Sequence, residues 1–321
     1  MSNLTKILQF LKKIFLDDPI ARTKRYTFWV VHFVIVHIPA VFTNYHYWYF
    51  HRLLKVNHEG CVEVLHLESQ IVYGCNLHCE FCIDFSPYQK GYVPADELLT
   101  SYAQWRKKVR PRRFVLTGGE PFLHPELARI IRESAKIWEG SKLWLNTNGL
   151  LLDRAKPEVL QAVKETGYEL IITEHTCEPE HRNKLDTVYA RLKKEGFRFV
   201  VRPSGSTWLA LYQYDNKGAL IPYKSNPKRA WGRCLSRTCT IISGDRLYKC
   251  TPLLCVRDAV QKGILDAADW KAALTYQPLT LQSTAEEIIA HLRHRAVPEC
   301  TICPEKNVTV PARQLPVKAG E

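Results

Sequence analysis

Three cysteines in one short loop, Cys75, Cys79 and Cys82, are the residues whose types and spacing most clearly indicate chemistry. Their C-x3-C-x2-C spacing offers three thiolates, with no fourth cysteine nearby. A [4Fe–4S] cluster held by three cysteines keeps one iron without a protein ligand, and that iron can bind a substrate or cosubstrate. A closed structural zinc site needs four ligands. The spacing therefore favours an open iron–sulfur cluster, with a partial zinc site or buried, inert thiols as the alternatives.

A glycine-rich turn, Gly118-Gly119-Glu120-Pro121, is the second motif, and it directly follows a predicted strand at residues 113–117. Adjacent glycines permit positive φ and let the backbone approach a ligand without an intervening Cβ atom. Glu120 adds a carboxylate that can bind a ligand or orient the neighbouring backbone. Such a sequence alone usually marks only a turn. Its place at the next strand end after the cysteine loop favours one shared site.

Together the two motifs resemble those of the radical S-adenosylmethionine (radical SAM) enzymes. The resemblance implies that the three cysteines hold a [4Fe–4S] cluster and that S-adenosyl-L-methionine chelates its open iron. It implies that Phe81 lies against the adenine, and that the element of Gly118, Gly119, Glu120 and Pro121 contacts the amino group. An electron from a flavodoxin- or ferredoxin-type donor would then split the sulfonium and give a 5′-deoxyadenosyl radical, which abstracts hydrogen from a substrate.

The chain from residue 64 to residue 201 alternates predicted strands and helices. This alternation predicts parallel strands with crossover helices, and an active site at the carboxyl ends of the strands. Periodicity alone does not separate a barrel from an open doubly wound sheet. The resemblance implies an α/β fold with a partial (β/α)6 TIM-like barrel of the radical SAM type. Strands are predicted at 64–72, 113–117, 142–146, 169–173 and 197–201, and helices around 95–109, 125–138, 155–166 and 181–195.

Polar residues follow the later predicted strands. Asn148 comes after the third strand, Glu174 and His175 after the fourth, and Arg202 after the fifth. By resemblance, Asn148 lies near the cofactor and the Glu-His pair meets its ribose. Arg202 is a candidate for the cofactor carboxylate or for an anionic substrate. Substrate contacts or solvated loop positions are the alternatives for all four residues.

A second group of cysteines lies between residues 234 and 303. Widely spaced cysteines that close with C-x2-C are compatible with a four-ligand metal or cluster site. The pattern resembles the twitch or SPASM extensions of radical SAM enzymes, which hold auxiliary [4Fe–4S] clusters. One such cluster is predicted, because the short tail lacks further cysteines. Its predicted ligands are Cys234, Cys250, Cys300 and Cys303; Cys239 competes with Cys234, Cys255 is a further competitor, and zinc is the alternative metal.

Two fates of a substrate radical fit these residues. An auxiliary cluster could accept an electron and give net oxidation, or a thiol, with Cys177 and Cys255 as candidates, could return hydrogen and invert a stereocentre. We therefore predict oxidation or epimerisation of a small polar substrate such as a sugar or aminocyclitol. The alternative is a maturase that modifies side chains or stereocentres of a ribosomally made peptide. Nucleic-acid modification and a non-catalytic iron–sulfur protein are less favoured.

The composition limits the classes of binding partner and the cellular compartment that are expected. The net charge of +13 over 321 residues attracts anions in general. Basic runs and standard nucleic-acid modules are absent, so nucleic acid is not favoured. Eleven cysteines, an odd number in clustered motifs, do not form a secreted disulfide framework. With no cleavable signal peptide, a reducing cytoplasm is the expected compartment.

Four segments are predicted along the chain. Residues 1–62 form a helical, aromatic-rich extension whose helix either lies on an anionic membrane surface or packs on the catalytic domain or a second subunit; packing is favoured. Residues 63–230 form the radical SAM core barrel. Residues 231–309 form the small auxiliary-cluster domain. Residues 310–321 are predicted to be a frayed tail.

Overall fold

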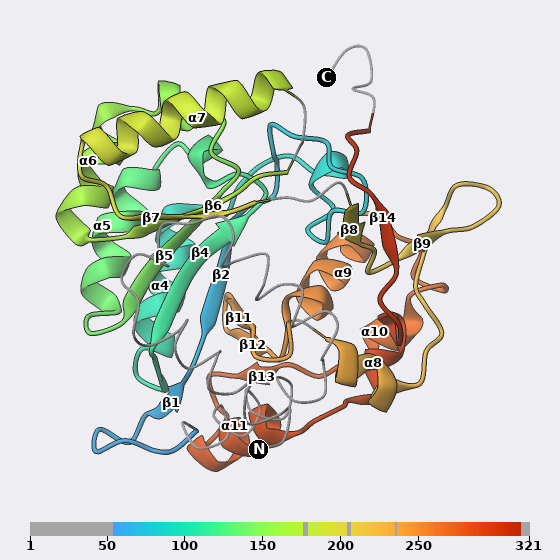
Figure 1. Cartoon of the computed structure of the whole chain (residues 1–321). Coiled ribbons are helices and arrows are strands. Elements are labelled where there is room, and N and C mark those ends of the chain that lie inside the picture. Colours follow the sequence, from blue (N-terminus) through green and yellow to red (C-terminus); the bar gives the residue numbers. More distant parts are fainter. Residues whose placement is uncertain (1–53, 176–178, 204–206, 235, 316–321) are drawn as a thin grey trace, which may run out of the picture. The chain divides into compact units, whose positions relative to one another are not determined.

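The computed structural model describes residues 54–175, 179–203, 207–234 and 236–315 (Figure 1). All of them belong to one compact unit. The helical pattern predicted near the amino terminus and the candidate thiol Cys177 lie outside the described residues. None of the described helices has the length and apolar character needed to cross a bilayer.

An eight-stranded sheet is the frame of the described unit, in the order β13-β12-β11-β2-β4-β5-β6-β7. Neighbouring strands from β11 to β7 pair in parallel, and β12 and β13 add an antiparallel edge beside β11. The strands are β2 (Leu67–Val72), β4 (Arg113–Gly118), β5 (Lys142–Thr147), β6 (Glu169–Thr173), β7 (Phe199–Arg202), β11 (Thr240–Ser243), β12 (Arg246–Tyr248) and β13 (Leu279–Thr280).

Four helices connect the parallel strands in succession and confirm the predicted α/β alternation. They are α4 (Ala95–Trp105), α5 (Leu127–Ile137), α6 (Pro157–Thr166) and α7 (Pro179–Lys194). Local sequence explains their ends: α6 begins with proline at its first turn and stops at Gly167, which has φ +70°. The first predicted strand divides in two, because β1 (Val62–Val64) pairs with β3 (Val109–Pro111) and only β2 joins the large sheet.

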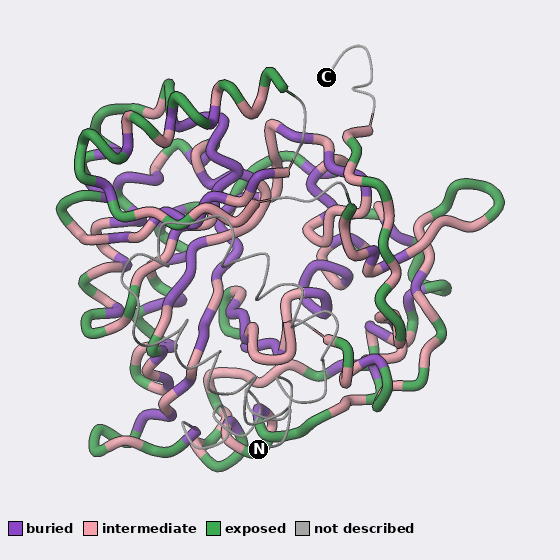
Figure 2. Tube along the Cα trace, viewed as in Figure 1, coloured by how far each residue is buried: buried purple, intermediate pink, exposed green. Residues whose placement is uncertain are grey.

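The two faces of the sheet differ in chemistry because side chains alternate along each strand. One face packs against α4–α7 and forms the main core, which includes Leu67, Phe114, Leu145 and Leu170. The opposite face, called here the inner face, carries Glu68, Gln70, Arg113, Thr117, Trp144, Asn146 and Arg202. Burial is greatest along the strands beneath the helices (Figure 2). The inner face is therefore the polar side of the sheet.

The carboxyl-terminal third extends this sheet rather than standing apart from it. Strand β11 pairs in parallel with β2, so the sheet continues across the boundary predicted at residue 231. A second apolar core, with Phe85, Tyr212, Trp270 and Ile302, nevertheless lies beneath this part. Within the described ranges, the other helices are α8 (Pro227–Arg233), α9 (Thr251–Gln261), α10 (Lys271–Leu274) and α11 (Ala285–Arg293), with 3-10 turns η2 (Ser86–Tyr88), η3 (Pro121–Leu123), η4 (Leu152–Arg154) and η5 (Pro298–Ile302).

The end of the described chain differs from the predicted frayed tail. Strand β14 (Thr309–Pro311) pairs with β8 (Thr207–Leu209), while β9 (Gln213–Tyr214) pairs with β10 (Leu220–Ile221). The residues after β14 then cross the cysteine loop: Gln314 forms a β-bridge with Cys79, and Arg313 forms an ion pair with Glu80. Backbone pairing and this ion pair hold the segment in place. Neither kind of contact produces a hydrophobic periodicity, so the sequence pattern did not predict them.

Candidate functional site

The cysteine loop leaves the carboxyl end of β2 and holds its three thiols close together. A turn in which the Cys82 amide donates to the Cys79 carbonyl at 3.3 Å brings these two residues onto one side. Burial raises the pKa of all three thiols, that of Cys82 to about 12, and the neighbouring thiols raise the pKa of Cys75 and Cys82 further. Metal binding would remove these protons. Three adjacent thiols in one loop fit three ligand positions of a [4Fe–4S] cluster.

The glycine turn is joined directly to this loop. The Gly119 amide donates to the Val72 carbonyl at 3.0 Å, and the Glu120 amide donates to the Gly74 carbonyl at 3.0 Å. Gly118 has φ +129°, a conformation that side chains with a Cβ rarely adopt. Pro121 then opens the short helix η3. The two sequence motifs therefore form one continuous surface at neighbouring strand ends.

Glu120 is the buried centre of this junction and is fully shielded from solvent. Its carboxylate accepts hydrogen bonds from the Thr147 hydroxyl at 2.7 Å and from the backbone amides of Asn148 at 2.8 Å and Phe122 at 3.2 Å. Burial raises the pKa of Glu120 to about 7, although these donors oppose the shift. In the structure Glu120 therefore orients the backbone of the turn and of the β5 end.

The Glu120→Gln variant tests how burial and hydrogen bonding together set the pKa of Glu120. The folded-state pKa lies above the ordinary value of 4.5, so the folded chain binds more protons than the unfolded chain at intermediate pH. The contribution of Glu120 to stability consequently falls as pH rises from about 4.5 to about 7, by about 1.4 kcal/mol per unit of pKa shift. We expect Glu120→Gln to lose this dependence, measured as thermal unfolding of both proteins between about pH 5.5 and pH 8. A constant difference between them would contradict it.

Asn148 connects β5 to the cysteine loop. Its side-chain amide donates to Asn76 Oδ1 at 2.7 Å and lies 3.7 Å from Cys75 Sγ. Phe81 has φ +60° and packs against Tyr212 and Tyr214, with ring centroids 5.4 Å and 5.3 Å away. Asn148 thus lies beside the loop, and Phe81 faces two aromatic rings of the chain itself.

The predicted pair Glu174 and His175 directly follows β6, and burial affects both residues. Glu174 is buried, and its Oε1 accepts a hydrogen bond from the Tyr189 hydroxyl at 3.1 Å. Burial lowers the pKa of His175 to about 4, so its imidazole is neutral near pH 7. Arg202 ends β7, and Thr173 at the end of β6 lies opposite it in the register. Each of these residues therefore occupies the strand end predicted for it.

On the inner face, Arg113 and Trp144, which the sequence pattern did not single out, lie near the predicted site residue Arg202. The Arg113 guanidinium lies 3.7 Å from the centre of the Trp144 ring, and that of Arg202 lies 5.6 Å from the same ring. Burial lowers the pKa of both arginines, and the charge of Arg202 lowers the pKa of Arg113 further. Two guanidiniums on one tryptophan form a setting that a bound anion would stabilise. The sequence signal for this arrangement is a charged residue within a predicted apolar strand, as at Arg113.

The four predicted auxiliary ligands lie at the ends of short elements. Cys234 ends α8, Cys250 precedes α9, Cys300 lies within η5, and Cys303 ends that turn. Burial and the other three thiols raise the pKa of Cys303. Nearby, the Lys249 ammonium donates to the carbonyls of His291 and Leu292, and burial lowers its pKa to about 8. The structure thus brings these four thiols together beside a cation.

The spacing of these four thiols bears on the choice between zinc and a cluster. In a tetrahedral zinc site with Zn–S bonds of about 2.3 Å, sulfur atoms lie roughly 3.8 Å apart. In the part of the chain that the structure describes, only His66, Glu68 and Cys239 place three ligand atoms within 4.8 Å of one another. The four thiols are not among such groups, and the choice between zinc and a cluster for them stays a prediction.

Cys255, the candidate hydrogen donor, lies in α9 and is almost fully buried. Its Sγ is 3.5 Å from Asp84 Oδ1, two residues beyond Cys82. Burial raises the pKa of Asp84 to about 6. The Cys255 thiol consequently lies next to the end of the cysteine loop, within the second apolar core.

Comparison with known proteins agrees with this geometry. The sequence model of the Radical SAM superfamily matches residues 69–203, which span the cysteine loop, the glycine turn and strands β4–β7. The chain contains a radical SAM domain. Twitch or SPASM character of the carboxyl-terminal third stays a prediction.

Curated relatives to which this chain is similar include two proteins named GTP 3′,8-cyclase. That of Aquifex aeolicus is 38% identical over 137 residues, 40% of this chain and 40% of the relative. That of Microcystis aeruginosa is 32% identical over 111 residues, 31% of this chain and 32% of the relative. The matches therefore span less than half of the length of either relative.

One solved structure that is similar is BtrN in complex with AdoMet and 2-DOIA. The two chains are 15% identical with a TM-score of 0.45, over 78% of this chain and 98% of BtrN.

Proposed function

We propose that this protein is a radical SAM enzyme that acts on a small polar substrate carrying an anionic group. The observation that carries the proposal is the direct joining of the three-thiol loop to the glycine turn, by the Gly119 and Glu120 amides. A [4Fe–4S] cluster with S-adenosyl-L-methionine bound there would supply a 5′-deoxyadenosyl radical. A flavodoxin- or ferredoxin-type protein is the proposed electron donor.

The residues of the chain would position the cofactor and keep water away from it. Glu120 and Asn148 hold the turn and the loop in one arrangement through buried hydrogen bonds. Glu174 and neutral His175 would border the nucleoside at the end of β6. Because an alkyl radical reacts with the nearest C–H bond, the placement of the substrate decides the product.

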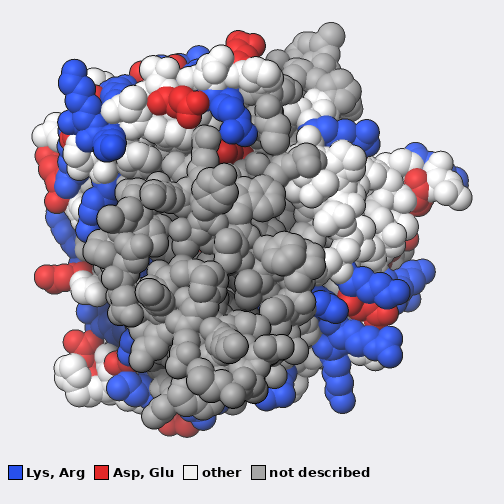
Figure 3. All heavy atoms as spheres, viewed as in Figure 1, with Lys and Arg blue, Asp and Glu red and all other residues white. Residues whose placement is uncertain are grey.

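The arginines of the inner face would orient the substrate. Arg113 and Arg202 both lie near the Trp144 ring, and their charges are partly buried. A phosphate or carboxylate between them would relieve their repulsion through charge-assisted hydrogen bonds. By contrast, the described Lys and Arg side chains on the face shown in Figure 3 are mixed with Asp and Glu around its margin. The arginine pair therefore favours a small anion over a nucleic acid.

The outcome of the reaction is proposed to be oxidation or epimerisation. Cys234, Cys250, Cys300 and Cys303 would hold one auxiliary [4Fe–4S] cluster. Oxidation would need such an electron acceptor, whereas epimerisation would need a hydrogen-donating thiol. A sugar-like substrate remains the leading proposal.

A nucleoside triphosphate is the second candidate substrate. It is favoured by the arginine pair and by the name of the relatives, GTP 3′,8-cyclase.

The decisive experiment is to quantify 5′-deoxyadenosine and methionine after the anaerobically reconstituted protein is reduced with dithionite and mixed with S-adenosyl-L-methionine. We expect both products in equal amounts. Their absence from protein with a full iron content would refute the proposed chemistry.

The anionic character of the substrate can be tested separately. We expect Arg202→Gln to weaken binding of GTP or of a sugar phosphate about tenfold or more, because a hydrogen bond to a charged group contributes about 1.5–3 kcal/mol. Arg246→Gln is the matched control, since Arg246 lies at the antiparallel edge of the sheet. Titration calorimetry measures both. Equal affinities for wild type and Arg202→Gln would contradict the assignment.

A further inference from the structure

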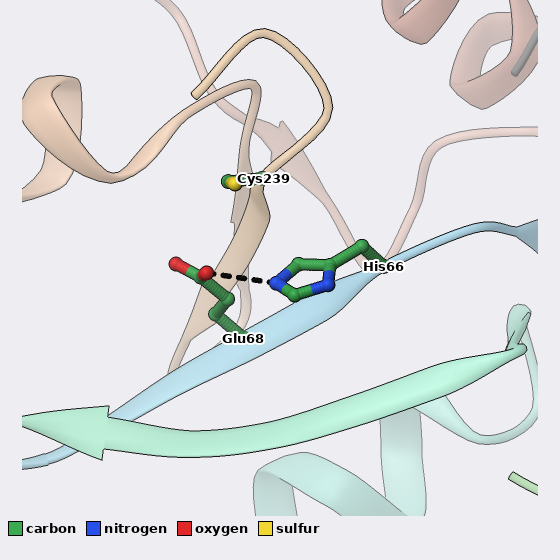
Figure 4. A group of neighbouring side chains, drawn as sticks. All are labelled: His66, Glu68 and Cys239. Atoms are coloured by element: carbon green, nitrogen blue, oxygen red, sulfur yellow. Dashed lines mark hydrogen bonds and ion pairs between the residues drawn. The ribbon is translucent and has the colours of Figure 1, made fainter. Parts of the chain in front are cut away.

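His66, Glu68 and Cys239 form a compact group of metal-binding side chains outside the two predicted ligand sets, for which Cys239 is only the competitor of Cys234. One ligand atom from each lies within 4.8 Å of the other two, and His66 Nε2 is 2.8 Å from Glu68 Oε1 (Figure 4). His66 is 8% exposed. The three ligand types are a nitrogen, an oxygen and a sulfur.

Backbone pairing places these three residues at neighbouring positions. In the parallel pair of β2 and β11, Leu67 lies opposite Thr240 and Glu68 lies opposite Ile241. His66 and Cys239 each precede the first of these pairs by one residue. Because alternate residues of a strand share a face, His66, Glu68 and Cys239 all lie on the inner face. Sheet pairing therefore brings together residues that are far apart in the sequence.

A second layer of contacts holds Glu68 in place. Its Oε2 accepts a hydrogen bond from the Thr251 hydroxyl at 2.6 Å. Metal-binding carboxylates typically have such outer partners, which orient them. Burial by itself would raise the pKa of Glu68, but the hydrogen bonds and positive charge around it, above all from His66, lower the pKa overall. Glu68 is thus a carboxylate at neutral pH, with one oxygen directed to the group.

The Glu68 carboxylate favours a cation at this group, and the charge of Arg202 opposes it. Burial raises the pKa of the Cys239 thiol, and the charge of Glu68 raises it further. A divalent ion would draw the proton from the thiol and offset the buried charge of the carboxylate. Imidazole and thiolate select zinc-type transition metals, whereas calcium and magnesium prefer oxygen ligands alone.

We propose that His66, Glu68 and Cys239 bind one zinc-class divalent transition-metal ion on the inner face, separate from both cysteine sets. Three protein ligands leave the fourth tetrahedral position to water or to an anionic group of a bound molecule. Arg202 lies close enough for its charge to act on Glu68 and Cys239. The site would thus place a cation beside the arginine pair. The proposal does not depend on the reaction proposed above.

Metal counting on the intact, anaerobically reconstituted protein tests this site. The wild type and the variants His66→Ala and Cys239→Ser are dialysed against buffered Zn²⁺, and zinc and iron per chain are measured by mass spectrometry. We expect the wild type to hold one zinc more than either variant, with unchanged iron. Cys61→Ser is the matched control, because Cys61 is a buried cysteine that contacts backbone carbonyls instead, and it should keep the zinc.

Zinc-edge X-ray absorption on the wild type gives a second readout that needs no variant. One sulfur among nitrogen and oxygen ligands is the expected first shell. Three results would overturn the proposal: equal zinc in wild type and Cys239→Ser, a shell of four sulfurs, or loss of iron in Cys239→Ser. The last result would instead make Cys239 a ligand of the auxiliary cluster.

Discussion

Replacement of Cys75, Cys79 and Cys82 together by alanine is expected to lower the iron content from about eight to about four per chain and to abolish 5′-deoxyadenosine formation. The three thiols lie in one loop, so their loss removes every side-chain ligand of the first cluster together. The four thiols between α8 and η5 remain. Iron and sulfide analysis with Mössbauer spectroscopy measures the first change, and product chromatography the second.

Two further variants show whether the loss of iron is specific to the first cluster. Cys250→Ala should remove the auxiliary irons and leave those of the cysteine loop, because Cys250 starts α9 beside the other carboxyl-terminal thiols. Cys61→Ser should leave all of the iron in place. Suppose the wild type held four irons that all vanished in the triple variant, while two zinc ions per chain remained, one more than the inner-face group would hold. The auxiliary-cluster assignment would then be wrong, and the carboxyl-terminal thiols would hold zinc.

The features that the sequence predicted correctly are those that depend on the spacing of nearby residues. The cysteine loop and the glycine turn are short motifs at strand ends, and the structure joins them through the Glu120 and Gly119 amides. The alternation of strands and helices also predicted β4 to β7 to within about two residues. Each of these features is encoded within about ten consecutive residues. It could therefore be predicted without knowing which distant segments pair with each other.

Features that depend on distant pairing could not be read from the sequence. The place of β11 beside β2 follows from a register between residues far apart along the chain, and only this register brings Cys239 to His66. Likewise, Trp144 fits an ordinary apolar strand position, and only the register of the sheet brings two arginines near its ring. Gln314 contacts Cys79 through a bridge that no periodicity marks.

Substitution of Gly119 by alanine is expected to have the second-largest effect, because the two motifs touch at this residue. An added Cβ atom would lie 2.6 Å from the Gly74 carbonyl carbon and still closer to its oxygen. Backbone atoms cannot move aside as a flexible side chain can. The chain must therefore separate the turn from the cysteine loop, at a cost of about 1–3 kcal/mol or more. We expect a lower unfolding temperature, at least tenfold weaker binding of S-adenosyl-L-methionine, and loss of iron from the first cluster.

Gly232→Ala separates this steric effect from the general consequences of replacing glycine. Apart from the backbone of α8 itself and the two chain neighbours, no atom of the described residues lies within 4 Å of the Cβ atom that would be added at Gly232. Alanine favours helix by about 1 kcal/mol over glycine, so this variant should be at least as stable as the wild type and should bind the cofactor equally well. Normal cofactor binding by Gly119→Ala would show that the loop and the turn can separate without harm. The contact between them would then not be what builds the site.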